Sequence, residues 1–142
     1  MEDPAQIIIT ELQASWLKAN TGGYKPSINL IYDVKREDVG INPSDSVLAY
    51  ATTHIERPAS LGFDTIDYTD HVSIDVRTTA SRTRMNQLRD EARRIIYNKR
   101  KSLSGYKLLT IDNGTDLSDR SIKLWRYIID VRMWKVITTV PS

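Results

Sequence analysis

Cysteine is absent from this sequence of 142 residues, which excludes disulfide bonds, thiol catalysis and thiolate metal sites together. No apolar run approaches the roughly 18 residues needed to span a membrane. The opening residues MEDPAQIII lack a basic region followed by an apolar one, so we expect no signal peptide. The formal net charge of +2 is too small to predict strong binding to nucleic acid.

What is present indicates one soluble domain that covers residues 1–142. A chain of this length can bury about two thirds of the surface that it exposes when unfolded, and it folds without covalent cross-links. We therefore expect a folded protein with its own apolar core and no membrane contact.

Residues 70–101 organise the chain, because they read as a strand that runs directly into a basic helix. Three apolar residues, Val72, Ile74 and Val76, alternate with polar ones, which is the period of a half-buried strand. Either Thr79 or Ser81 can then cap a helix. The helix has an apolar stripe at three- and four-residue steps, formed by Met85, Leu88, Ala92, Ile95 and Ile96.

Four arginines of this helix, spaced by seven, four and seven residues, form a row beside the apolar stripe: Arg82, Arg89, Arg93 and Arg100. Two interpretations compete. Their aliphatic stems can cover the edge of the core while the guanidinium groups pair with nearby acids. Alternatively, the row faces a polyanion or an acidic partner.

The remaining elements follow from shorter patterns. Asp3-Pro4 opens a helix that ends at Gly22-Gly23. Alternating residues predict strands at 28–34, 46–57 and 106–112, and Asn113-Gly114 after the last of these is a strong hairpin signal. Residues 58–69 read as a long connection that exposes Leu61, Phe63 and Ile66, as a docking surface would.

The final segment, residues 121–139, is almost continuous strand sequence. At about 3.3 Å per residue it would extend on the order of 60 Å, which is longer than a small sheet needs. We expect this strand, which includes Trp134, to bend or to lend one end to a neighbouring subunit. The complete order, α-β-β-β-α-β-β, predicts an α+β domain with two helices on one face of an antiparallel or mixed sheet of about five strands.

An acid, a valine and a base recur in three strands, beginning at Asp33, Asp75 and Asp130. Residues two apart share a face of a strand, so each segment places an acid beside a base. The segments are interpreted as a ladder of ion pairs or, alternatively, as a metal-dependent nuclease with carboxylates on neighbouring strands. With His54 and His71 far apart and no nucleophile–base set, we expect no catalytic residue, no cofactor and no metal site.

The segment HVSIDVRTTASRTRMNQLRDEARRII resembles the strand-to-helix segment of tail terminator (tail completion) proteins from long-tailed double-stranded DNA viruses of bacteria or archaea. In that family, a strand with alternating apolar, Asp, apolar and Arg residues leads into a basic amphipathic helix, and a β-hairpin follows. The order of elements from Ile7 to Thr139 also agrees.

The resemblance implies a structural protein without enzymatic activity that assembles as a ring, usually of six copies. It implies a place at the tail–neck junction of the virion, after assembly in the host cytoplasm. The implied partners are further copies of the chain, the tail tube protein and a neck or head-completion protein, with non-specific contact to DNA that passes through the ring. A neck or head-completion (head–tail connector) protein is the first alternative, and a metal-dependent nuclease is the second. The residues expected to contact partners are Arg82, Arg89, Arg93, Arg100, Leu61, Phe63, Ile66 and Trp134.

Overall fold

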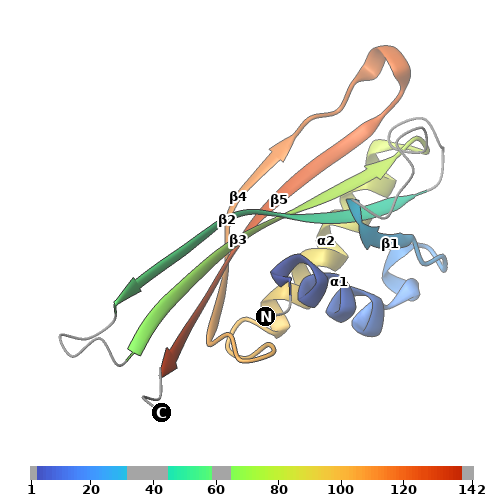
Figure 1. Ribbon diagram of the computed structural model, residues 1–142. Coiled ribbons are helices and arrows are strands. Elements are labelled where there is room, and N and C mark those ends of the chain that lie inside the picture. The colour runs from blue at the N-terminus through green and yellow to red at the C-terminus, as the bar shows by residue number, and fades with distance from the viewer. Residues whose placement is uncertain (1–2, 32–44, 59–64, 139–142) are drawn as a thin grey trace.

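The computed structural model describes residues 3–31, 45–58 and 65–138, which form two α-helices on one face of a five-stranded sheet (Figure 1). In chain order the elements are α1 (Pro4–Ser15), the 3-10 helix η1 (Lys18–Thr21), β1 (Ser27–Leu30), β2 (Ser46–Pro58), β3 (Thr65–Thr78), α2 (Arg82–Asn98), β4 (Leu108–Asp116), the 3-10 helix η4 (Arg120–Ile122) and β5 (Trp125–Thr138). The strands lie in the order β1-β2-β3-β5-β4. Strands β1 and β2 are parallel, and the other neighbouring pairs are antiparallel. The predicted α+β class with a mixed sheet is confirmed.

Both α-helices begin at side-chain caps. A carboxylate oxygen of Asp3 accepts a hydrogen bond from the Ala5 amide at 2.9 Å, and the Ser81 hydroxyl accepts one from the Arg84 amide at 3.1 Å. Helix α1 ends at Ser15, which is earlier than the glycine pair predicted. It ends there because the Leu17 amide donates to the Glu91 carboxylate of α2, at 2.7 Å, instead of continuing the helix.

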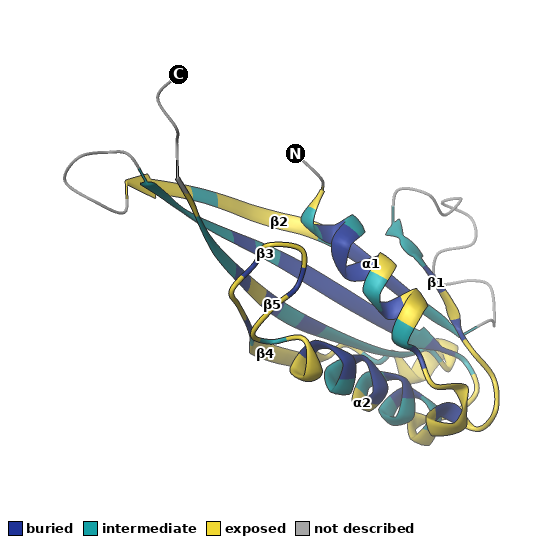
Figure 2. Ribbon diagram, turned by 90° about the horizontal axis from the view of Figure 1, so that it is seen from below, coloured by how far each residue is buried: buried dark blue, intermediate teal, exposed yellow. Residues whose placement is uncertain are grey.

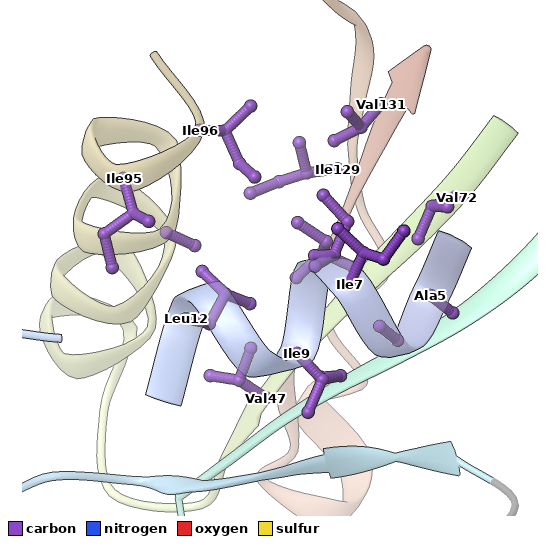
Figure 3. Close-up of a cluster of buried hydrophobic side chains, with 14 of the residues drawn as sticks. Ala5, Ile7, Ile9, Leu12, Val47, Val72, Ile95, Ile96, Ile129 and Val131 are labelled. Carbon is purple, nitrogen blue, oxygen red and sulfur yellow. The ribbon is translucent and has the colours of Figure 1, made fainter. Parts of the chain in front are cut away.

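The core lies between the helices and the sheet face that they cover (Figure 3). All five residues of the apolar stripe predicted for α2 are buried. All of them except Met85 belong to one buried cluster with Ile7, Ile9 and Leu12 of α1 and the helix-facing residues of the strands. Ile74, at the centre of β3, is 0% exposed, so its replacement by alanine would cost about 2–5 kcal/mol.

The two longest strands, β3 and β5, pair with each other over their whole length, from Thr65 opposite Thr138 to Thr78 opposite Trp125. Two predictions were therefore wrong. Half of the predicted long connection at 58–69 is strand, because Pro58 ends β2 and Thr65 begins β3, and residues 59–64 lie outside the described residues. The terminal strand also has no surplus length, since β3 is as long and pairs all of it.

Asn113-Gly114 does not form the hairpin turn that its sequence predicts. Both residues lie inside β4, next to a β-bulge between Ile111 and Asn113, and the chain reverses only after Asp116. The bulge adds a residue to β4 and shifts its register on β5, so the asparagine–glycine pair is used within the strand.

Three strands extend beyond the helices as an arm, which we define as Ala51–Pro58 of β2, Thr65–Asp70 of β3 and Met133–Thr138 of β5 (Figures 1 and 2). Strand β1 pairs with β2 only from Ser46 to Ala49, so within the described residues the outer edge of β2 in the arm has no neighbouring strand. Figure 2 shows that this part of β2 is mostly exposed.

Candidate interaction surfaces

The arginine row of α2 lies beside the start of β5, where its guanidinium groups contact aromatic side chains. The Arg82 guanidinium lies 5.9 Å from the centre of the Trp125 ring and pairs with Asp116. The guanidinium groups of Arg89 and Arg93 lie 5.1 and 5.3 Å from the centre of the Tyr127 ring. Such cation–π contacts hold the side chains in place.

Arg100 is separate from the other three. Its guanidinium stacks on Tyr97 at 4.0 Å and donates to the Tyr97 carbonyl at 2.8 Å. The structure thus brings Arg82, Arg89 and Arg93 together along β5 and leaves Arg100 at the end of the helix. The spacing of the row in the sequence could not show which aromatic ring lies opposite each arginine.

Gly114 allows Tyr127 to lie against β4. A Cβ atom at this glycine would be 2.3 Å from the Tyr127 hydroxyl oxygen and 2.9 Å from Nη2 of Arg93. The same Nη2 donates to the Tyr127 hydroxyl at 2.9 Å. Gly114 is therefore needed for a close approach, and the phenol and the guanidinium share the space that a side chain would fill.

The second surface is the arm, which carries apolar side chains on both of its faces. Ile66 and Ile137 face the side of the sheet that bears the helices, and Ile55, Trp134 and Val136 face the opposite side. Ile137 is 36% exposed and the other four are half-buried. Exposed apolar surface costs about 25 cal/mol per Å², so residues on both faces of an arm favour a covering partner.

Trp134 lines a groove of about 350 Å³ at the base of the arm, on the face without helices. Leu108 and Ile55 supply its other apolar walls, while Arg57 and Arg132 lie among its polar ones. Ile66 lines a smaller groove with Pro58. The remaining two predicted contact residues, Leu61 and Phe63, lie outside the described residues.

A hydrogen-bonded cluster that no sequence pattern predicted connects the arm to the body of the domain. Asp70 of β3 is 2% exposed and accepts from the Tyr106 hydroxyl at 2.5 Å and from Nδ1 of His54. Burial, and then the bond to Asp70, raise the pKa of Tyr106, so its phenol stays protonated and donates. Lys135 lies over the Tyr106 ring at 4.5 Å. His54 and Asp70 are 16 residues apart, and only the register of β2 on β3 brings them together.

His54 is held between two carboxylates, since its Nε2 lies 2.8 Å from an oxygen of Glu56. The hydrogen bond with Glu56, followed by that with Asp70, raises the pKa of His54. An imidazole that faces an acceptor at each nitrogen is fully satisfied only when both nitrogens carry protons. The cluster therefore favours the imidazolium form of His54.

The three acid–valine–base segments differ in what they do. Asp75, with its side chain 0% exposed, binds Arg77 of its own strand at 2.8 Å and Arg126 of β5 at 2.9 Å. Asp130 accepts from the Ser73 hydroxyl at 2.8 Å. The segment at Asp33 lies outside the described residues. Asp75 fits the ion-pair interpretation, because both of its oxygens are already engaged by guanidinium groups.

In the described parts of the chain, no three His, Asp or Glu side chains lie close enough to hold a metal ion. Neither α-helix there is long and apolar enough to cross a membrane. No protein-family model matches this sequence, and no curated protein matches it significantly.

Proposed function

We propose that the chain is a structural subunit that assembles with copies of itself through the three-stranded arm. The observation that carries this proposal is the arm itself: three strands continue past the helices with apolar residues on both faces, and no strand among the described residues pairs with the outer edge of β2 there. Apart from Asp70 and Met133 at its base, the described side chains of the arm stay exposed or half-buried in the single chain, so most of the arm adds little to the chain's own core. A neighbouring copy would cover it and pair its edge.

The place of this assembly in a virus particle is proposed from the resemblance of residues 71–96 to tail terminator proteins. In this proposal the chain forms a ring, expected to have six copies, that caps the tail tube and joins the tail to the neck of a long-tailed virus. It acts by binding and not by catalysis. The α+β fold and the order of elements support this proposal. The same fold and order would also fit a neck or head-completion protein, which is the alternative.

Native mass spectrometry of the purified chain, with and without a tail tube protein, tests the proposal. A closed ring that binds the end of the tube supports a tail terminator. A ring that binds a head-completion protein but not the tail tube would favour the alternative, a neck protein. A monomer at tens of micromolar in both samples would contradict the assembly.

A further inference from the structure

Helix α2 carries a local excess of positive charge that the described part of the chain does not neutralise. Most of its arginines have a carboxylate partner, such as Asp45 for Arg84 and Glu91 for Arg94. Arg89 shares the exposed carboxylate of Asp90, and among the described residues no carboxylate lies within ion-pair distance of Arg93. Two like charges four residues apart destabilise a helix slightly, so a bound anion would stabilise this pair.

The two guanidinium groups are also held in place before any ligand arrives. Both lie on the ring of Tyr127, at 5.1 and 5.3 Å from its centre, and the phenol oxygen accepts from Nη2 of Arg93 at 2.9 Å. Arg89 is only 22% exposed in its side chain and uses Nε for Asp90. In the described part of the chain, both terminal nitrogens of Arg89, and Nε and Nη1 of Arg93, donate to no protein acceptor.

We propose that Arg89 and Arg93, positioned by Tyr127, bind a phosphate group. Two planar guanidinium forks present several N–H donors together, which matches the several oxygens of a phosphate better than the two of a single carboxylate. Partial burial strengthens such charge-assisted hydrogen bonds by limiting competition from water. The phosphate comes either from the backbone of DNA or from a free phosphate compound, because the chemistry of recognition is the same.

The site is separate from the arm, since Tyr127 lies near the start of β5 and the arm contains its end. It therefore goes beyond the proposed assembly, and either proposal can fail alone. Gly114 belongs to the site because a Cβ there would displace both the phenol and Arg93.

Thermal unfolding in inorganic pyrophosphate, against sodium chloride of the same ionic strength, tests binding. A ligand that binds only the folded state raises the midpoint with concentration, which gives an apparent Kd. We expect Arg89→Gln and Arg93→Gln each to weaken pyrophosphate binding at least about tenfold, because each removes a charge-assisted hydrogen bond. Arg100→Gln is the matched control, as it removes an arginine just beyond the end of the same helix that stacks on a different ring. Equal binding by the three variants, or no stabilisation of the natural chain, would overturn the proposal.

Binding of a short DNA duplex at several salt concentrations then distinguishes the two sources. If the ligand is DNA, the Arg89→Gln, Arg93→Gln double variant should lower the slope of log affinity against log salt by about two. An unchanged slope together with lost pyrophosphate binding assigns the site to a free phosphate compound. The mass of the assembled protein should be the same with and without these substitutions, which separates this site from the arm.

Discussion

At the residue scale, His54 makes the stability of the protein depend on pH near neutrality. Its two carboxylate partners raise its pKa in the folded state above the value of about 6.5 expected in the unfolded chain. A raised pKa adds stability that is complete below the unfolded pKa and is lost as the pH rises through the folded pKa. His54 thus strengthens the base of the arm most in mildly acidic solution.

We expect His54→Gln to reduce the free energy of unfolding more at pH 5.5 than at pH 8.5. Urea titration at the two pH values measures this difference. His71→Gln, at the chain's other histidine, is the matched control. The same loss for His54→Gln at both pH values would show that Glu56 and Asp70 do not raise the pKa of His54 in the folded protein.

Gly114 is the residue at which the smallest change should have a large local effect. Gly114→Ala places a Cβ atom 2.3 Å from the Tyr127 hydroxyl oxygen, so the ring must move. We expect a loss of about 1–3 kcal/mol in the free energy of unfolding, as for other overpacked sites. Tyr127→Phe removes the clashing oxygen, so the double variant should lose less than the sum of the two single variants. Thr115→Ala, at the neighbouring residue, is the control and should change the free energy of unfolding little. If the losses of Gly114→Ala and Tyr127→Phe simply add in the double variant, this account of the glycine is wrong.

At the element scale, Glu91 joins α2 to the chain between α1 and η1. This carboxylate is 2% exposed and accepts from the Leu17 amide at 2.7 Å, from Asn20 at 2.9 Å and from Arg94 at 2.6 Å. Burial alone would raise the pKa of Glu91, but the bonds from Arg94, Leu17 and Asn20 outweigh it and lower the pKa. The stability from this group is therefore present above the unfolded pKa and is lost as the pH falls through the folded pKa.

We expect Glu91→Ala to cost about 1–3 kcal/mol, because it leaves buried donors without an acceptor. Hydrogen exchange resolved by residue should show faster exchange at the Leu17 amide. Asp90→Ala removes an exposed carboxylate from the same helix and should leave that amide protected. Unchanged exchange at Leu17 in Glu91→Ala would mean that η1 is held by other contacts.

The sequence patterns correctly predicted the segments that face the core. They gave wrong predictions for segments that do not face it. The stripe of α2 and the alternation of Val72, Ile74 and Val76 were correct because burial imposes both periods. Ile66 and Tyr68 lie on the same face of β3 as Val72, Ile74 and Val76. They were predicted to be part of a loop because their neighbours are polar and this part of β3 lies beyond the core. Asn113-Gly114 misled for another reason, because the glycine accommodates Tyr127 and does not form a turn.

The candidate surfaces were predicted less well than the fold. The spacing of Arg82, Arg89 and Arg93 correctly placed them on one side of α2, but Tyr127 and Gly114 are far from them in the chain and had no signal of their own. His54 and Asp70 meet only through the register of β2 on β3, which a β-bulge between Ala51 and Thr53 shifts. A shift of one residue reverses which side chains share a face.

At the scale of the whole molecule, the two ends of the long strands differ. One end carries the helices and the phosphate site, and the other is the arm. A contact between unlike surfaces of identical copies repeats from copy to copy, and it closes as a ring when the rotation allows. The account therefore depends on whether the arm is the contact between copies.

The most direct measurement is the mass of the assembled protein after polar residues are placed on the arm. Ile55→Asp and Ile66→Asp together put a charge on each face of the arm without changing the buried core of the body. Native mass spectrometry should find the natural chain as one closed ring and this variant as a monomer with an unchanged circular dichroism spectrum. Tyr24→Asp, at a residue that is 76% exposed outside the arm, is the control and should still form the ring. A ring of the same mass from the arm variant would contradict the account.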